Sequence, residues 1–443
     1  MKYLLTDEQT IGDLRIFGQR DSSGMYDLYN STHTRGAETV LKEMFTKPLA
    51  DQGEINRRSS IIEHFAGMGL SFPFEAALFD MAEKYLTAAD EQKKQGTQHA
   101  VLSEKEIANG VMAVIELIQR IREFVDRKEV TGISALTPER ESIILLLQDT
   151  AFEPVMREQG KGKIAYAAVT AYDLLFRHRE RSKVEKLLGH IYFLDVYMSV
   201  AKVAKERKFV FPKAMEKGKC HLRIEGVYHP ELSNPVSNDF AMHPERNLLF
   251  LTGANMAGKS TFLRAVSTAV YVAHMGFPVA AKLMEFSVFD GIYTTINLPD
   301  NLGIGASHFY AEVLRVKKVA TELNAGKSLF IIFDEMFRGT NVKDAHEATV
   351  EISIAFAAKK NSLFIISSHI VEAGERLQQV PSIGFQYLPT RMNGHMPEYT
   401  YTLENGITAD RHGMIIIRNE GILEILQHGR KRAVRRTIGS YAD

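Results

Sequence analysis

The chain has 443 residues, enough for two or three domains with hydrophobic cores of their own. Hydrophobic residues make up 45% and charged residues 24% of the sequence, as in an ordinary globular protein. Basic and acidic residues both number 54, so the bulk charge predicts no polyanionic partner, and nucleic-acid binding would have to depend on local patches. The single cysteine, Cys220, excludes an internal disulfide framework and favours a reducing, cytoplasmic compartment. No apolar run approaches the ~18 residues of a membrane span, so we expect no membrane partner.

Residues 1–215 are predicted to be predominantly α-helical. Apolar residues recur at steps of three or four between Ile107 and Val125, and again between Ile191 and Ala204. This spacing is typical of helices that bury one face in a core. A cluster of basic residues over 177–183 could face DNA, but such a cluster more often marks a solvated helix face.

Beyond Cys220 the pattern changes to short apolar strands that alternate with helices. Strands are predicted at 248–252, 290–297, 329–333 and 363–367, and the intervening helices follow Lys259, begin near Ser307 and cover about 343–360. Strand–helix alternation predicts a three-layer α/β domain with a largely parallel sheet.

The predicted organisation is therefore a helical domain over 1–215, an α/β domain over 216–427 and a basic C-terminal tail over 428–443. The tail has five basic residues within 430–436. It could bind phosphates, or it could be a frayed and solvated terminus.

A phosphate-binding loop is predicted between the strand that ends near Thr252 and the helix that follows it. The loop fits the pattern G-x-x-x-x-G-K-[ST] at every defined position, with the residues Gly253, Ala254, Asn255, Met256, Ala257, Gly258, Lys259 and Ser260, followed by Thr261. Backbone N–H groups and the helix N-terminus would hold a polyanion. Lys259 would reach the β and γ phosphates, and the Ser260 hydroxyl would be a Mg²⁺ ligand. The sequence thus predicts a nucleotide site.

Two later strands end in residues that suit hydrolysis of that nucleotide. The apolar run from Leu329 ends at Asp334 and Glu335, and carboxyl ends of parallel strands face the ligand crevice. Asp334 would help to hold Mg²⁺, and Glu335 could act as a general base on the attacking water. The run from Leu363 delivers His369 to the same edge, where the imidazole could bond to the γ-phosphate or to its water.

Together these segments resemble the MutS family of DNA mismatch-repair ATPases. The loop LTGANMAGKSTFLR is similar to TGPNMGGKST of that family, DEMFRGTN at 334–341 to DE-x-x-RGTS, and the pair at 368–369 to its TH. GASHFYAE at 305–312 resembles GxSTFxxE, and the helical half resembles the core domain of the family at 26–36, 47–58 and 194–212. The implied fold is a helical core/lever domain followed by an α/β P-loop NTPase domain of the ABC-ATPase-like kind.

The resemblance implies a Mg²⁺-dependent ATPase that uses ATP and works as a homodimer. Ser307 would act in trans on the nucleotide of the opposite subunit, and Asp344 would lie at the dimer seam. Duplex or branched DNA is the implied partner, in mismatch repair or recombination, with a repair protein as a further candidate partner. The alternative is an ATP-switched protein-interaction module that does not bind DNA directly. A generic ABC-type motor fits less well, because no LSGGQ-like signature occurs.

The chain also departs from the family pattern. The resemblance starts at the core domain, so we expect no Phe-x-Glu wedge that reads mismatches, and we expect 59–189 to be too short for full levers with a DNA clamp. Within the motifs the substituted positions are Ala254, Ala257, His308, Phe337 and Ala345. No aromatic residue that would stack on adenine stands just before Asn238.

Overall fold

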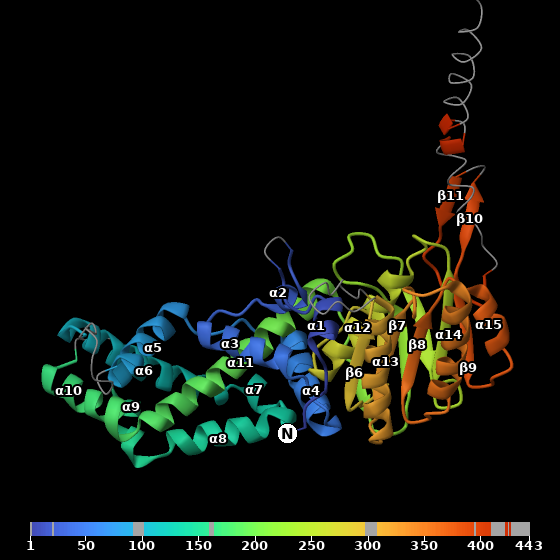
Figure 1. Cartoon of the computed structure of the whole chain (residues 1–443). Coiled ribbons are helices and arrows are strands. Elements are labelled where there is room, and N and C mark those ends of the chain that lie inside the picture. The colour runs from blue at the N-terminus through green and yellow to red at the C-terminus, as the bar shows by residue number, and fades with distance from the viewer. Residues whose placement is uncertain are drawn as a thin grey trace, which may run out of the picture. The chain divides into compact units, whose positions relative to one another are not determined.

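The computed structural model describes residues 2–19, 22–91, 102–158, 164–296, 308–393, 396–408, 421–423 and 425–426 (Figure 1). The chain divides into two compact units. The helical unit comprises Met1–Tyr3, Arg15–Lys213 and Val272–Val279, and the α/β unit comprises Leu4–Leu14, Ala214–Tyr271 and Ala280–Asp443. The prediction of a helical region followed by an α/β region is confirmed. The sequence pattern did not predict that 4–14 belongs to the α/β unit and that 272–279 belongs to the helical unit.

The described part of the helical unit is made mainly of α-helices. They are α2 (Met25–Tyr29), α3 (Arg35–Thr46), α4 (Gln52–Met68), α5 (Ala76–Glu91), α6 (Glu104–Val125), α7 (Lys128–Thr131), α8 (Thr137–Leu147), α9 (Glu153–Arg157), α10 (Tyr166–Leu174) and α11 (Arg181–Arg207). Both predicted apolar stripes lie in single helices, α6 and α11, and their residues form the core of the unit. Ser103 and Glu106 form a capping box, which fixes the start of α6.

Helix α11 is long and apolar enough, among the described helices, to be tested as a membrane span, with a mean hydropathy of 1.2 over its most apolar window. In the structure 72% of that window is buried by the rest of the protein. A buried core helix passes the same test, and we describe α11 as one.

The buried carboxylate of Asp195 in α11 fixes the start of α3. It accepts hydrogen bonds from the backbone N–H groups of His33 (3.0 Å) and Thr34 (2.9 Å), and from the Thr34 hydroxyl (2.9 Å). Thr34 in turn caps α3 by accepting from Ala37 N–H. A buried carboxylate is tolerated because its oxygens are satisfied in this way. The residues at 26–36 and 194–199 are therefore linked by direct contacts.

The segment 272–279 is bound firmly within the helical unit. Val210 and Val279 form an antiparallel bridge, and Leu49 N–H donates to His274 O at 2.9 Å. The Tyr29 hydroxyl donates to Pro278 O at 2.6 Å. Since this segment includes the last residues of the helix that follows the phosphate loop, that helix begins in one unit and ends in the other.

A six-stranded sheet organises the α/β unit, in the order β12-β9-β4-β8-β7-β6. Its strands are β4 (Leu248–Gly253), β6 (Gly291–Thr295), β7 (Leu329–Asp334), β8 (Leu363–Ser367), β9 (Ile383–Leu388) and β12 (Glu404–Asn405). All pairs are parallel except β12 with β9. The largely parallel sheet was predicted from the alternation of strands and helices.

Helices connect these parallel strands. They are α12 (Lys259–His274), α13 (His308–Asn324), α14 (Val342–Ala357) and α15 (Val371–Leu377). Alternate strand residues such as Ile331, Phe364 and Ile366 pack with α13, α14 and α15 in one buried cluster, so these helices cover one face of the sheet. Phe356 of α14 stacks on Phe364 with 4.8 Å between the ring centroids.

Two further sheets in the structure were not predicted. A four-stranded sheet has the order β1-β5-β2-β3, built from β1 (Lys213–Met215), β5 (Leu283–Ser287), β2 (Leu222–Val227) and β3 (Asn238–Met242). A hairpin pairs β10 (Thr390–Asn393) with β11 (Met396–Tyr399). Only the parallel sheet delivers its carboxyl ends to one edge, and that edge carries the predicted site.

Candidate functional site

The predicted phosphate loop connects β4 to α12. Gly253 and Gly258 both have positive φ angles, 152° and 98°, that L-residues rarely adopt. A Cβ atom at Gly258 would lie 2.9 Å from the ring of Tyr401, so a side chain is excluded there by contact as well as by conformation. Met256 at the tip of the loop also has a positive φ (70°) and is 75% exposed. The loop thus keeps its backbone accessible between two glycines.

Lys259 is the first residue of α12, and its ammonium group is buried against the loop. Its Nζ donates to Gly253 O at 2.8 Å and to Ala254 O at 3.3 Å, and lies 4.0 Å from Glu335 Oε1. Burial lowers the pKa of Lys259, while the neighbouring carboxylates of Glu335 and Asp334 oppose that shift. The lysine is thereby placed between the loop carbonyls and the carboxylate pair.

Asp334 ends β7 beside the first turn of α12. The Ser260 hydroxyl donates to Asp334 Oδ2 at 2.5 Å, and the Ser367 hydroxyl donates to Oδ1 of the same carboxylate. Ser367 ends β8, where its Cα is paired with that of Asp334 across the parallel ladder. One hydroxyl and one carboxylate side by side are the hard oxygen ligands that Mg²⁺ takes together with phosphate oxygens. Ser367 was not predicted as a site residue, although the strand register would have pointed to it.

No group of three or more His, Cys, Asp or Glu side chains that could hold a metal ion occurs among the described residues.

Glu335 follows Asp334 in a left-handed backbone conformation, with φ of 60°. A non-glycine residue there costs about 1–2 kcal/mol, and such strain tends to collect at functional sites. The conformation is held by a backbone hydrogen bond from Glu335 N–H to Ser367 O at 3.0 Å. It turns the Glu335 carboxylate toward His369 (Nδ1–Oε2 3.5 Å) and Arg338 (Nε–Oε2 3.1 Å).

These contacts shift the pKa values of Glu335 and His369. The hydrogen bond from His369 is the main cause that lowers the pKa of Glu335; burial opposes it, and the Arg338 charge adds to the lowering. The same bond raises the pKa of His369 above its ordinary value. Arg338 also donates to Asp334 O at 2.9 Å. Arg338 lies within the segment compared with the family but was given no role from the sequence.

Replacing Glu335 with Gln should lower the pKa of His369 toward 6.5, because the replacement removes the main cause of its elevation. As the pH rises, the imidazole of the variant should therefore lose its proton at a lower pH than the imidazole of the wild type does. NMR titration of the histidine ring signals in nucleotide-free and metal-free protein measures this, with His369→Asn to assign the signal. An unshifted midpoint would show that the two side chains are not coupled.

Phe337 replaces the glycine expected at its position and adopts a positive φ of 64°. The strain is offset by packing, because the Phe337 side chain is 3% exposed and its ring lies 5.9 Å from that of Phe309 in α13. The segment after the carboxylates is therefore fixed to α13.

A cavity of about 290 Å³ opens beside the loop. It is lined by apolar and polar residues of β2, β3, the segment between them and the first turns of α12, and by Tyr401. Asn238 holds Tyr401 in place, since its side-chain amide donates to Tyr401 O (2.9 Å) and accepts from Leu403 N–H (2.7 Å). Tyr401 is 45% exposed and has a positive φ of 56°. An aromatic side chain from a distant part of the chain thus lies beside Asn238 and lines this cavity.

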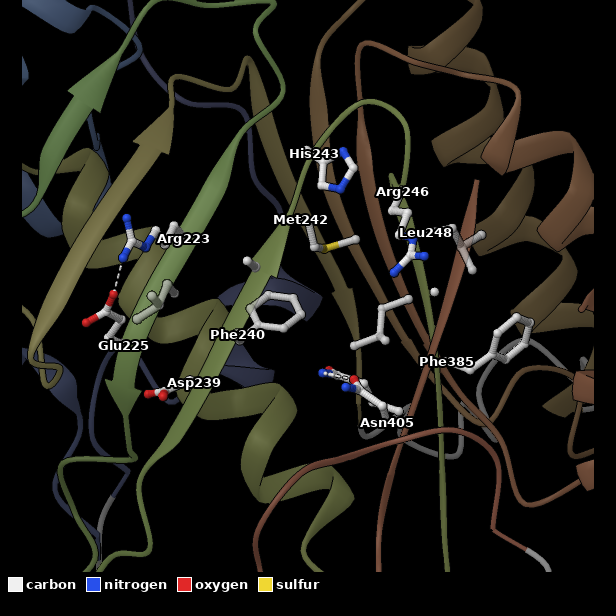
Figure 2. Close-up of a pocket in the computed structure, with 15 residues that line it drawn as sticks. Arg223, Glu225, Asp239, Phe240, Met242, His243, Arg246, Leu248, Phe385 and Asn405 are labelled. Carbon is white, nitrogen blue, oxygen red and sulfur yellow. Dashed lines mark hydrogen bonds and ion pairs between the residues drawn. The ribbon is translucent and has the colours of Figure 1, made fainter. Parts of the chain in front are cut away.

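A second cavity of about 470 Å³ lies between β2 and β3 on one side and β4 and β9 on the other (Figure 2). Figure 2 shows Phe240 and Leu248 among the residues that line it, together with the hydrogen-bonded side chains of Arg223 and Glu225. Because Leu248 is at the opposite end of β4 from Gly253, this cavity is not part of the phosphate site.

Some predicted features lie elsewhere. Ser307 and the basic tail 428–443 fall outside the described residues. Asp344 is in the first turn of α14, where its N–H donates to Asn341 Oδ1 at 2.9 Å. The basic cluster at 177–183 is largely engaged in ion pairs, of Arg177 with Asp173 and of Lys183 with Asp149 and Glu180.

Comparison with known proteins gives consistent matches. Residues 249–435 match the family described as MutS domain V. The protein named DNA mismatch repair protein MutS of Petrotoga mobilis is 28% identical over 279 residues, which are 61% of this chain and 33% of that protein. Its namesake of Geobacillus thermodenitrificans is 32% identical over 223 residues, 48% of this chain and 22% of that protein. The matched regions span a third or less of the length of these relatives.

Proposed function

We propose that the chain is a Mg²⁺-dependent ATPase that works as a homodimer and controls DNA binding in mismatch repair or recombination, because residues 249–435 match the family described as MutS domain V. The observation that carries the proposal is the convergence of Lys259, Ser260, Asp334 and Glu335 at one edge of the parallel sheet, with Ser260 Oγ 2.5 Å from Asp334 Oδ2. We expect it to act in the cytoplasm, where its thiol stays reduced.

ATP would bind with its phosphates along the backbone of 253–261. Ser260 and Asp334 would hold Mg²⁺, which when bound neutralises charge on the β and γ phosphates. Lys259 would exchange its bonds to the loop carbonyls for bonds to phosphate oxygens. These fixed charges would stabilise the charge that develops as the γ-phosphate is transferred.

Glu335 would orient the attacking water and accept its proton. The lowered pKa keeps this carboxylate ionised, as a general base requires. His369, whose side chain is 60% exposed, would leave Glu335 to bond to the γ-phosphate or to the water. Arg338 would hold the backbone at Asp334 while this exchange takes place.

The adenine base would enter the cavity beside the loop and lie against Tyr401. Replacing Tyr401 with Ala should weaken ATP binding about tenfold, since stacking of a base on an aromatic side chain contributes ~1–3 kcal/mol. Binding of inorganic tripolyphosphate should not change, and Tyr401→Phe should bind ATP like the wild type. Calorimetric titrations compare the ligands. Equal loss for ATP and tripolyphosphate would mean that Tyr401 supports the loop and does not contact the base.

A homodimer is supported by exposed apolar side chains on two helices that cover the parallel sheet. Tyr310 and Leu314 of α13 are 54% and 45% exposed, and Val342 at the start of α14 is 74% exposed. Such residues mark interaction surfaces when they occur together. In the dimer we expect Ser307, which precedes α13 in the sequence, to reach the nucleotide of the other subunit.

DNA is the proposed partner on the strength of the relatives' names and family. The alternative, an ATP-switched protein-interaction module, is favoured by one observation. Most basic side chains of the cluster at 177–183 form ion pairs with acidic residues of the same chain, so few of them are available to bind phosphates.

Gel shifts separate the two functions. Homoduplex, mismatched and junction DNA are each tested with and without ATP and over a range of salt. The DNA-binding proposal expects at least one shape to bind, with an affinity that falls steeply with salt and changes with ATP. If no DNA binds or stimulates hydrolysis, the protein-interaction function replaces it, and a repair protein becomes the partner to seek.

A further inference from the structure

The segment Leu4–Leu14, which we call the N-terminal brace, packs in the α/β unit although it precedes the whole helical unit in sequence. It contains helix α1 (Glu8–Asp13). β6 is the last strand of the six-stranded sheet, and the brace binds its free edge: Leu5 N–H donates to Asp290 O at 2.8 Å, and Ile292 N–H donates to Leu5 O at 2.9 Å (Figure 1). The brace thus continues the sheet by one short bridge.

Side chains of α1 then satisfy the backbone where β6 ends. Thr294 N–H donates to Thr10 Oγ1 at 3.1 Å, and Ile296 N–H donates to Asp13 Oδ2 at 2.8 Å. The Thr294 hydroxyl donates to the same Asp13 oxygen at 2.9 Å. Thr10 and Asp13 are 0% and 3% exposed. Without the brace these buried amide groups would lose their partners, which is costly in a protein interior.

Asp7 connects this strand end to α13. Lys318 Nζ donates to Asp7 Oδ2 at 2.6 Å, and Arg315 donates to both carboxylate oxygens of Asp7. Burial alone would raise the pKa of Asp7, but the hydrogen bonds from Arg315 and Lys318 outweigh it and hold that pKa well below its usual range. The carboxylate is therefore charged at any physiological pH.

Arg315 of α13 bonds to both the brace and β6. It is 8% exposed, and besides Asp7 it donates to Thr294 O at 2.7 Å and to Thr295 Oγ1 at 3.2 Å. Its guanidinium and the Lys318 ammonium each lie 5.5 Å from the centroid of the Tyr293 ring. Brace, β6 and α13 are thus held in one geometry by bonds that converge on a buried guanidinium.

This geometry matters for catalysis because of what α13 carries. The ring of Phe309 in its first turn packs on Phe337, which follows the carboxylate pair by two residues. Ser307, which the proposed function expects to act across the dimer, directly precedes α13 in the sequence. We propose that the N-terminal brace positions α13 for ATP hydrolysis, with Asp7 as the positioning residue, and the inference rests on the proposed ATPase function. Nucleotide binding at 253–261 would not depend on it.

Asp7→Asn tests the brace selectively. Asp7 also caps α1 by accepting from Thr10 N–H at 3.0 Å, and the Asn side-chain oxygen can still do so. What is lost is the charge and the acceptor oxygen that face Arg315 and Lys318. Asp51→Asn is the matched control. Asp51 caps α4 of the helical unit in the same way, by accepting from Glu54 N–H at 3.0 Å.

We expect kcat of Asp7→Asn to fall about tenfold, because small displacements remote from the chemistry slow it strongly. The Kd for ATP should stay within about twofold of wild type, and Asp7→Glu should recover most of the rate. Asp51→Asn should match wild type in both. An unchanged kcat in Asp7→Asn would overturn the proposal. So would a parallel loss of kcat and ATP affinity, since that would indicate general destabilisation.

Hydrogen exchange provides a measurement that does not depend on activity. Asp7→Asn should speed exchange of the Thr294 and Ile296 amides and of the first turns of α13, while β4, β7 and β8 stay as protected as in wild type. If wild type hydrolyses no more ATP than Lys259→Ala does, the proposed ATPase function fails. Hydrogen exchange then tests by itself whether the brace positions α13. Unchanged exchange at Thr294, Ile296 and α13 in Asp7→Asn would show that it does not.

Discussion

Replacing Lys259 with alanine is expected to abolish ATP hydrolysis and to weaken ATP binding by at least ~100-fold, the scale on which loss of one fixed charge or donor affects such sites. The wild-type ammonium lies among Gly253 O, Ala254 O and the Glu335 carboxylate, where it can transfer to phosphate oxygens with little movement. The variant removes the one side-chain cation of the loop.

Calorimetric titration with ATP and a phosphate-release assay measure the two effects. Lys219→Ala is the matched control, because its side chain is 58% exposed and its ammonium pairs with Glu216 at the surface. The control should bind and hydrolyse ATP as wild type does. An ATP titration of Lys259→Ala that matches wild type would remove Lys259 from the site.

Replacing Glu335 with glutamine is expected to slow hydrolysis by ~10²–10⁴-fold, the usual contribution of a general base, while ATP still binds. Glutamine keeps the size of the side chain and loses the charge and the proton acceptor. Because bound ATP would persist, the variant should accumulate as an ATP-bound dimer if the site is shared between subunits.

Size-exclusion chromatography with light scattering, with and without ATP and Mg²⁺, measures this accumulation. Glu351→Gln, an exposed position on α14, provides the control and should turn over ATP normally. A Glu335→Gln protein that stays monomeric with ATP bound would contradict the composite-site dimer. Rapid hydrolysis in that variant would instead exclude Glu335 as the base.

The parts of the site that the sequence could predict are those fixed by local rules. The phosphate loop follows from glycine and lysine spacing between a strand and a helix, and Asp334 follows from a buried strand that ends in a carboxylate. Both rules work because the carboxyl ends of parallel strands share one edge. The helices α6 and α11 could be predicted in the same way, since apolar residues at a period of 3.6 indicate a helix that buries one face.

The parts that could not be predicted depend on pairing across long stretches of chain. Ser367 reaches Asp334 only through the register of β7 and β8. Tyr401 reaches the loop because Asn238, more than 160 residues earlier, bonds to its backbone. The brace reaches Arg315 across about 300 residues. No local pattern encodes such contacts, because each depends on the folded position of both partners.

Each unit contains a short segment from the other part of the sequence, which affects whether the two units can be separated. The stretch 214–443 looks like a separable cassette by sequence, yet it would lack the partners of Thr294, Ile296 and Arg315, which the first 14 residues provide. It would also carry 272–279 without Leu49, Tyr29 and Val210, to which that segment is bonded. We therefore expect a chain cut near residue 214 to leave unpaired groups in both pieces, and a fusion of 214–443 to a different N-terminal half would have to supply both sets of contacts.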